Sequence, residues 1–517
     1  MFISRGQPST VSGALNTRLL LPAFFLLMVS WLNGCNLQQS LHRLQLGDLG
    51  HFEYRTAQAH MAGVVIGAPH GFADAKAVLL AKQISGRTGA GLVAAYGFKS
   101  KRISVTQPIS RIHAQPVARL EPAKRRSVFP EFKQVIREVS NGEIDLYVEL
   151  RFQKGNDGFQ GIEVASSGFT FEEARIIEQS YAAVAEHVGR AEPVAKLPLW
   201  IDHSNKISMD TWGIRHHGVL MIAEKGLSVR IPEKLLSERD LDVFGEILTA
   251  WIKELARLVH ENPRGVPQIQ ARLLDFGRLD IIPSRAERTG LVIGAPHGSC
   301  DAHTAGIARQ LAFRTGWAAV VARGFTPTES GDGRRIHVNR PTEGRFSLSE
   351  REFETERARA TYAEFKSSVL SAAQGNLDLY IDIHHNDGSH IEVASMGLSR
   401  AEARLVKDAY RAARDEVLAR RSDTAIIDLA IEPLDEITVG AWAAKTNGIL
   451  ALAHRSLHFE LPANGVMSFA RQRQIYTTIL GQLIAGLPAA LGLPVRNLRC
   501  ADLCQQWARS GASSDPR

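Results

Sequence analysis

The sequence predicts an α/β protein built from two tandem homologous domains, each with a mixed or parallel central sheet flanked by helices. The chain has 517 residues, which exceeds one ordinary hydrophobic core and suits two domains. The stretch IGAPHGFAD at Ile66 returns as IGAPHGSCD at Ile293. Short apolar runs that end in glycine alternate with segments of helical spacing, which is typical of α/β domains.

The repeat extends well beyond these nine residues. LGDLGHF at Leu46 matches LLDFGRL at Leu273, and GEIDLYVEL at Gly142 matches GNLDLYIDI at Gly375. A period this long indicates duplicated domains and not a solenoid. We therefore predict a first repeat over 44–262, a second repeat over 272–490 and a carboxyl-terminal tail over 491–517.

Residues 1–35 predict a lipoprotein-type signal segment. Arg18 precedes LLLPAFFLLMVSWL, an apolar run that is short for a bilayer span but typical of a signal-peptide core. The run ends in LNGC, which resembles the bacterial lipobox and predicts lipid attachment at Cys35. The protein is then exported to the cell envelope and anchored in the periplasm or at the outer membrane. The alternatives are an uncleaved signal anchor and a soluble protein whose start is misplaced.

Composition excludes several function classes. The formal net charge of +7 is mild and scattered along the chain, so nucleic acid is not an expected partner. The sequence has no glycine-rich phosphate loop and no GxSxG nucleophile turn. Its four cysteines form no metal-ligand pattern. Cys500 and Cys504 could pair in an exported protein, and Cys300 is expected to fill space.

The elements of the second repeat follow in order along the chain. GLVIGAPHG predicts a buried strand, DAHTAGIARQLAFRTG a helix with a glycine stop, and WAAVVARG another strand. A long charged helix is expected over 348–373, before the strand LDLYIDIHH. Ser399 and Glu402 form a capping box for the next helix. Ligands of such sheets gather where strands end in loops, and the repeated His/Asp loop lies at such an end.

Candidate metal ligands occur at two of these strand ends. His297 and Asp301 follow one strand, and DIHH places His384 and His385 at the end of another. Two imidazoles and a carboxylate with an open fourth position are the donor set of a catalytic zinc site. Strand alternation places Asp382 and His384 on one face and His385 on the other, which favours His384 as ligand and Asp382 as its orienting partner. Alternatively, the His/Asp pair forms a loop hydrogen bond and the His pair is a polar strand end.

Two further motifs of the second repeat carry polar groups suited to a substrate. RRIHVNRP contains Asn339 and Arg340, and arginine is the natural bidentate partner of a carboxylate. HFELP places Glu460 within an apolar strand. A carboxylate is costly there unless it has a partner, such as a water molecule that it could deprotonate.

The ordered set APHGSCD, RIHVNRP, DIHH and HFELP resembles the N-formylglutamate amidohydrolase family, within the zinc carboxypeptidase-like group and its phosphorylase/hydrolase-like fold. The resemblance covers most of the second repeat. It implies three zinc ligands, His297, Asp301 and His384. It also implies that Glu460 is the general base, and that Asn339 and Arg340 hold a substrate carboxylate. Asp301 departs from the pattern, because the wider group commonly uses Glu at a shorter spacing.

The implied activity is zinc-dependent hydrolysis of an amide bond. The resemblance points to an N-acylated or γ-linked acidic amino acid or peptide as the substrate, and the predicted export favours a cell-wall fragment. The alternative is a non-catalytic envelope lipoprotein that binds peptides or wall fragments. The two repeats are expected to pack on each other.

The first repeat is expected to be inactive. It keeps His70 and Asp74, but Arg151 stands at the place of the third zinc ligand and Arg230 at the place of the general base. A guanidinium group at such positions opposes metal binding. The conserved-looking pair His70 and Asp74 is then expected to hold the loop after the strand, although a remodelled binding site is the alternative.

Two other sets of polar residues receive structural interpretations. His216 and His217 are expected in a surface turn. Glu163 and Glu392 occupy matching IEVAS strands of both repeats, which favours structural ion pairs, with Glu392 lining the site as the alternative.

Overall fold

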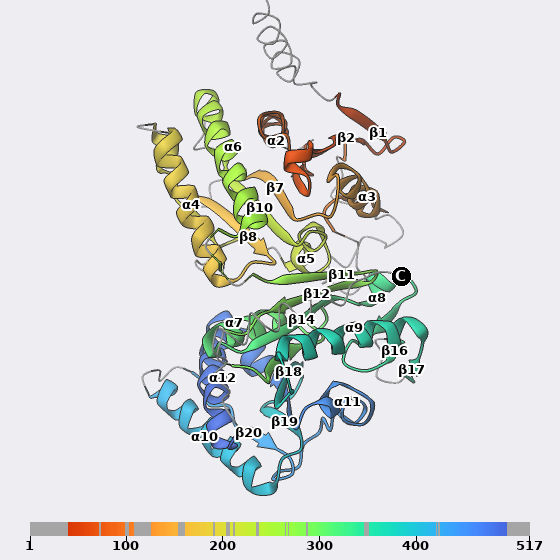
Figure 1. Ribbon diagram of the computed structural model, residues 1–517, viewed down its shortest axis with the longest axis vertical. Coiled ribbons are helices and arrows are strands. Elements are labelled where there is room, and N and C mark those ends of the chain that lie inside the picture. Colours follow the sequence, from red (N-terminus) through yellow and green to blue (C-terminus); the bar gives the residue numbers. More distant parts are fainter. Residues whose placement is uncertain are drawn as a thin grey trace, which may run out of the picture. The chain divides into compact units, whose positions relative to one another are not determined.

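The computed structural model divides the chain into two compact units, Met1–Leu41 and His42–Arg517 (Figure 1). The structure describes residues 40–71, 74–98, 103–107, 126–153, 161–189, 192–202, 207–209, 212–233, 237–263, 265–266, 268–285, 288–345, 351–419, 421 and 424–493. The predictions for the signal segment, Cys35, Cys500 and Cys504 lie outside these residues. All elements below belong to the second unit. Among the described helices, none combines the length and the apolar character needed to cross a membrane.

The first repeat is built on an eight-stranded mixed sheet with the strand order β1-β2-β4-β3-β7-β10-β8-β9. Its strands are β1 (His42–Gln45), β2 (His51–Arg55), β3 (Val64–Ala68), β4 (Gly91–Tyr96), β7 (Leu146–Gln153), β8 (Ile162–Ser167), β9 (Leu199–Ile201) and β10 (Lys225–Pro232). Its helices are α2 (Ala75–Thr88), α3 (Phe129–Val139), α4 (Phe171–Gly189), α5 (Trp212–His216) and α6 (Glu238–Glu261). Short strands β5 (Ile103–Ser104) and β6 (Arg126–Ser127) pair separately.

The second repeat has the same topology, with the strand order β11-β12-β14-β13-β18-β21-β19-β20. Its strands are β11 (Gln270–Leu274), β12 (Gly277–Ile282), β13 (Leu291–Ala295), β14 (Ala318–Gly324), β18 (Leu379–Asn386), β19 (Ile391–Met396), β20 (Leu429–Ile431) and β21 (Arg455–Pro462). Its helices are α7 (Thr304–Thr315), α8 (Pro327–Ser330), α9 (Glu356–Ala373), α10 (Arg400–Leu418), α11 (Trp442–Asn447) and α12 (Ala470–Ala490). A small sheet joins β15 (Arg334–Ile336), β16 (Thr342–Arg345) and β17 (Phe353–Glu354).

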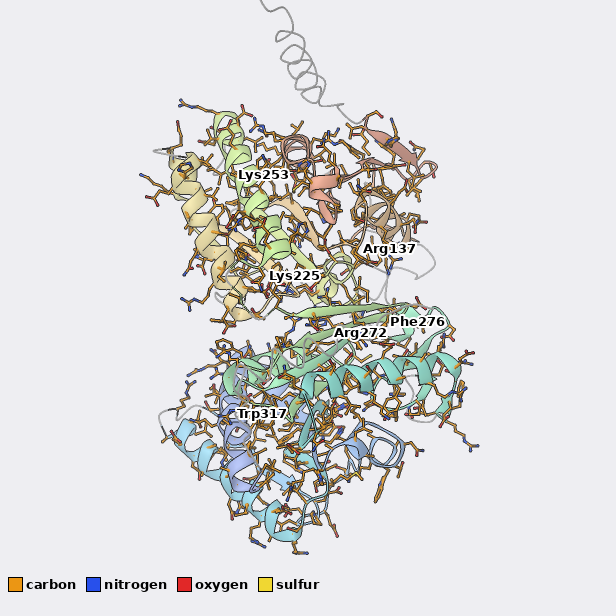
Figure 2. All side chains as sticks on the ribbon, viewed as in Figure 1. Arg137, Lys225, Lys253, Arg272, Phe276 and Trp317 are labelled. Carbon is orange, nitrogen blue, oxygen red and sulfur yellow. The ribbon has the colours of Figure 1, made fainter. Side chains whose placement is uncertain are left out.

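Helices cover both faces of each sheet, which confirms the predicted fold class. In the second repeat α7, α10 and α12 pack on one face and α9 on the other. In the first repeat α2, α4 and α6 cover one face and α3 the other. The central strands β13 and β14 are buried along their whole length, as expected for parallel strands covered on both sides. Trp317, just before β14, is fully buried (Figure 2).

The prediction of a helix over 348–373 is wrong at its start. The helix α9 begins at Glu356, because the side chain of Thr355 caps it by accepting a hydrogen bond from the Ala358 amide at 3.1 Å. Phe353 and Glu354 form β17 instead. The predicted capping box of Ser399 and Glu402 is confirmed at the start of α10.

Gly294 and Tyr380 lie between the hydrophobic core and the polar end of the second sheet. Gly294 on β13 passes directly over the buried ring of Tyr380 on β18, and a Cβ atom at Gly294 would collide with the tyrosine hydroxyl. That hydroxyl donates to Asp382 Oδ1 at 3.2 Å. Gly67 and Tyr147 repeat the arrangement in the first sheet. Close strand approach therefore requires glycine at this position.

We predict that Gly294→Ala lowers the free energy of unfolding by about 1–3 kcal/mol, because the new methyl group overpacks the core against Tyr380. Gly306→Ala is the control, since Gly306 lies exposed on α7 with open space around it and alanine there is expected to stabilise by about 0.5–1 kcal/mol. Thermal unfolding followed by circular dichroism measures both. Equal unfolding temperatures for wild type and Gly294→Ala would contradict the collision.

Candidate metal centre

Four polar side chains share one face of two neighbouring parallel strands. The register of β18 and β21 places Asp382 opposite His458 and His384 opposite Glu460. Because successive residues of a strand alternate between faces, these four residues point to the same side. All four are buried. Buried ionisable groups at the carboxyl ends of parallel strands mark this position as a candidate site.

These side chains form a continuous set of contacts. Asp382 Oδ2 lies 3.0 Å from His384 Nε2 and 3.2 Å from His458 Nδ1. His458 Nε2 lies 3.0 Å from Glu460 Oε1. One potential ligand atom from each of Asp382, His384 and His458 lies within 4.8 Å of the others, which is close enough for a shared ion.

The loop after β13 brings the other predicted ligands to the same place. Asp301 Oδ2 lies 3.1 Å from His384 Nδ1. The rings of His297 and His384 have centroids 4.9 Å apart. The structure therefore brings together all the predicted ligands with Asp382 and Glu460. The roles assigned to them remain predictions.

His385 lies closer to this cluster than strand alternation suggests. Its Nδ1 atom is 3.9 Å from Asp301 Oδ1, so both histidines of the pair approach the same carboxylate. Strand β18 ends at Asn386, and the Asp301 loop folds over that end.

The residues fit a divalent metal ion. The site holds only imidazole and carboxylate donors, the set that zinc and related ions prefer. Among the described residues, His385 Nδ1 and His337 Nδ1 are buried without a hydrogen-bond partner, and His384 Nε2 makes no regular hydrogen bond although it lies 3.0 Å from Asp382 Oδ2. Buried polar atoms without partners are rare, and a bound ion would account for those of the cluster. Two sets of ligands that share His384 could hold the ion. One is the predicted set His297, Asp301 and His384, and the other is Asp382, His384 and His458.

Without an ion, the carboxylates of the site are balanced by a proton on His384. Burial lowers the pKa of His384, but the Asp382 carboxylate and a hydrogen bond with Asp301 outweigh burial and raise it to about 10. Burial raises the pKa of Asp382, but the charge of His384 brings it well below its ordinary value. Burial and the charge of Arg335 lower the pKa of His297, which keeps that imidazole neutral. A protonated His384 thus lies between two carboxylates.

The predicted substrate residues lie at the edge of the cluster, but Arg340 is already paired. Arg340 Nε donates to Glu352 Oε2 at 2.9 Å, and Nη2 donates to Oε1 at 2.5 Å. His337 Nε2 lies 3.2 Å from the same carboxylate. Asn339 is buried, and its side-chain oxygen accepts from Arg340 Nη1 at 3.3 Å. A ligand carboxylate would therefore compete with Glu352 for Arg340.

Sequence reasoning missed several residues of the site. His458 stands two positions before Glu460, so strand alternation could have placed both on one face. Arg335 Nη2 lies 3.6 Å from Asp301 Oδ1. Neither Arg335 nor Glu352 carried a local signal, because each meets the site through contacts with distant segments.

The first repeat fills the same place with arginine. Arg151 Nη2 and Nε donate to Ser228 Oγ at 2.9 and 3.1 Å, and Nε lies 3.3 Å from Glu149 Oε1. Glu149, Arg151 and Ser228 match Asp382, His384 and His458. In the described part of this repeat no set of three close metal donors occurs.

Asp74 has the structural role expected of it. Its Oδ1 atom accepts from the Ala77 amide at 3.1 Å and caps α2, and its Oδ2 atom accepts from the Phe152 amide. Asp301, in contrast, does not cap α7, and its carboxylate faces His384. The aspartate at this position thus accepts hydrogen bonds from backbone amides in the first repeat and contacts His384 in the second.

The prediction of a surface turn at His217 is wrong. His217 is buried, and its Nδ1 atom lies 2.6 Å from Glu329 Oε1 of the second repeat, because this segment packs across the two repeats. The ion pair predicted for Glu163 is confirmed with Arg230 as its partner.

Glu392 supports a loop by accepting hydrogen bonds from the amides of Thr438 and Val439. These contacts make it a structural residue, although its hydrogen bonds come from a loop backbone and not from an arginine. Cys300 is a free thiol, and burial raises its pKa to about 11. A thiol with so high a pKa is a weak nucleophile, in agreement with the expected space-filling role.

Solved structures with partial similarity to this chain include three hydrolase-type proteins. A bacteriophage poly-γ-glutamate hydrolase shares 14% identity, covering 43% of this chain and 91% of its own, with a TM-score of 0.25. A candidate metallopeptidase of Shewanella amazonensis shares 14% identity, covering 44% and 88%, with a TM-score of 0.25. A candidate carboxypeptidase of Burkholderia mallei shares 14% identity, covering 44% and 65%, with a TM-score of 0.28.

No protein-family model and no curated protein matches the sequence. The resemblance to N-formylglutamate amidohydrolases therefore stays a prediction. What the site can do depends on the geometry of its own residues.

We predict that binding of a zinc ion at about pH 7 releases about one proton per ion, because His384, with a pKa of about 10, must lose its proton to become a ligand. The apparent affinity then rises about tenfold per pH unit below that pKa. Calorimetric titration in buffers with different ionisation enthalpies measures the release. His454→Ala, which changes an exposed histidine just before β21, is the control and keeps the release. Binding without proton release would show that His384 is not a ligand.

Proposed function

We propose that the chain is a zinc-dependent amidohydrolase whose active site lies in the second repeat. The observation that carries the proposal is the convergence of Glu460 with the buried histidine and aspartate cluster at one end of the second sheet. A glutamate beside a metal-ligand cluster is the arrangement expected of a general base.

His297, Asp301 and His384 would hold the ion, as the motif resemblance implies. His458 has both ring nitrogens within 3.2 Å of carboxylates, which suits a residue that orients Asp382 and Glu460. A zinc ion at this position supplies Lewis-acid chemistry, which polarises a carbonyl group and lowers the pKa of water.

Glu460 would accept the proton of the attacking water and pass it to the leaving amine. It is buried, and His458 Nε2 holds it at 3.0 Å, so its carboxylate keeps a defined direction. A base with a fixed orientation loses little entropy when the substrate is bound.

The substrate class is an N-acylated or γ-linked acidic amino acid or peptide. Arg340 is the cation that would receive its carboxylate, with Asn339 buried behind it. The contact with Glu352 supports this assignment, because it demonstrates that a carboxylate fits against Arg340 in a bidentate manner. We further propose export and lipid anchoring through Cys35, which favours a cell-wall-derived substrate.

Assay of zinc-loaded protein against N-acylglutamates and γ-glutamyl peptides tests the proposal. We expect Glu460→Gln to lower kcat by about a hundredfold to ten-thousandfold while zinc stays bound, because only the proton acceptor is lost. His384→Ala is expected to lose both zinc and activity. Arg230→Gln, at the matched position of the first repeat, is the control and keeps both. A chain that binds zinc but hydrolyses none of these compounds would favour a non-catalytic binding protein.

We also predict that Glu352→Gln lowers KM for an acidic substrate severalfold with little change in kcat, because the internal carboxylate no longer competes for Arg340. Glu354→Gln, two residues further along the chain, is the matched control, since Glu354 Oε2 lies 3.6 Å from Arg359 Nη1 and not at the cluster. Steady-state kinetics measure both variants. A higher KM in Glu352→Gln would mean that Glu352 holds Arg340 in place.

A further inference from the structure

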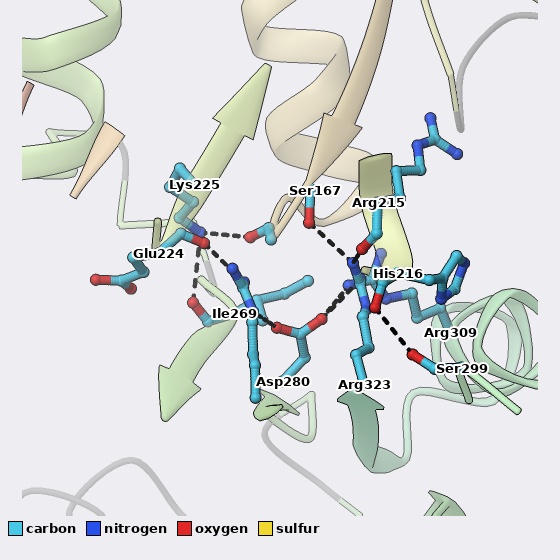
Figure 3. Close-up of polar contacts among 12 residues, drawn as sticks. Ser167, Arg215, His216, Glu224, Lys225, Ile269, Asp280, Ser299, Arg309 and Arg323 are labelled. Carbon is cyan, nitrogen blue, oxygen red and sulfur yellow. Dashed lines mark hydrogen bonds and ion pairs between the residues drawn. The ribbon is translucent and has the colours of Figure 1, made fainter. Parts of the chain in front are cut away.

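The first repeat contacts the second repeat beside the candidate metal centre, although arginines fill its own matched site. The contacts come from residues 215–217, at the end of α5, which we call the α5 brace. Figure 3 shows the carbonyl groups of Arg215 and His216 facing Arg323 and Ser299 of the second repeat.

The α5 brace is itself firmly held in the first repeat. The His217 amide donates to the Gly213 carbonyl at 3.0 Å, and the Val219 amide donates to the Thr106 carbonyl at 2.9 Å. The side chain of Arg215 pairs with Asp202, which follows β9. These contacts hold residues 215–217 in place within the first repeat, so that a segment of the second repeat can pack against them.

One contact reaches the loop that carries two predicted ligands. Ser299 lies between His297 and Asp301 and is almost fully buried. Its hydroxyl donates to the His216 carbonyl at 3.2 Å and accepts from the Gly324 amide at 2.8 Å. The first repeat has Phe72 at the matched position, so the hydroxyl belongs to the second repeat alone.

A second contact holds the end of β14 and the helix after the ligand loop. Arg323 Nη1 donates to Ser167 Oγ at 2.8 Å and to the Arg215 carbonyl at 3.2 Å, while Nη2 lies 2.7 Å from Asp280 (Figure 3). Asp280 also pairs with Arg309 on α7. Arg323 and Asp280 are buried, so these bonds are shielded from water and geometrically restrictive.

A third contact reaches the segment before the predicted substrate residues. His217 Nδ1 lies 2.6 Å from Glu329 Oε1. The other oxygen of Glu329 accepts from the Thr326 amide at 3.2 Å and completes the cap of α8. That helix leads directly into β15, which carries Arg335.

The contact is one-sided at this segment. In the second repeat the residues matching His216 and His217 are Thr446 and Asn447, and both are exposed. The α5 brace therefore makes contacts across the two repeats that no described contact of its counterpart matches.

We infer that the first repeat is a positioning module for the metal centre of the second repeat. Ser299, His216 through its carbonyl, and His217 are positioning residues that hold the ligand loop and the α8 segment in register with β18 and β21. This inference rests on the proposed function, since it requires a metal ion at that centre.

Cobalt binding to the full-length protein tests the inference, because its visible spectrum reports ligand geometry without requiring hydrolysis. We expect Ser299→Ala to weaken cobalt affinity about tenfold and to change the spectrum, as loss of a supporting contact does at other metal sites. Ser299→Thr keeps the hydroxyl group and is expected to keep the cobalt affinity and the spectrum of the wild type. Glu172→Gln is the matched control, because Glu172 pairs with Arg285 across the two repeats at an exposed position.

A double-mutant cycle of His217→Ala and Glu329→Ala provides a second measurement that does not depend on the folding of the serine variant. We expect the two changes to be non-additive in cobalt affinity. Unchanged affinity in Ser299→Ala and an additive cycle would overturn the inference, as would equal weakening in Glu172→Gln. A wild-type chain that binds no cobalt or zinc would reject the metal centre itself and this inference with it.

Discussion

The buried carboxylate of Asp382 is the group around which the second repeat is organised. It is fully inaccessible to water, and an unpaired charge there would be severely destabilising. Its neighbours satisfy it from three directions, through the hydroxyl of Tyr380 and the imidazoles of His384 and His458. The tyrosine in turn requires Gly294 on the next strand. The charge of Asp382 thus connects the close packing of β13 and β18 with the histidines of the candidate metal centre.

The first repeat also has a buried carboxylate at this place, but an arginine lies beside it. Its buried Glu149 faces Arg151, whose guanidinium group also reaches Ser228. A fixed cation therefore lies beside the buried carboxylate in this repeat. The two sheets share their topology, so the fold allows both outcomes and the side chains at the strand ends decide between them.

The first repeat contacts the second although Arg151 fills its own matched site. The two repeats meet through buried groups such as Arg323, which donates to Ser167 Oγ of the first repeat and pairs with Asp280 of the second. Such contacts tie the position of the loop that carries His297 and Asp301 to the first repeat.

The sequence by itself determined the α/β class, the repeated succession of strands and helices and most of the residues at the candidate site. These follow from local patterns, since the alternation of side chains along a strand and the spacing of a helix are properties of short segments. Parallel strands bring their ends to one edge of the sheet, and the pairing of β18 with β21 then places Asp382, His384 and Glu460 side by side.

Only the tertiary structure decided which groups pair across long distances. The contact of Arg340 with Glu352, the position of Arg335 beside Asp301 and the burial of His217 all join segments whose relative positions no local pattern encodes. The start of α9 shows the same limit, because Phe353 and Glu354, which were expected in the helix, pair with β16 instead. Partners for buried charges depend on the packing of whole domains, and that packing is a property of the complete fold.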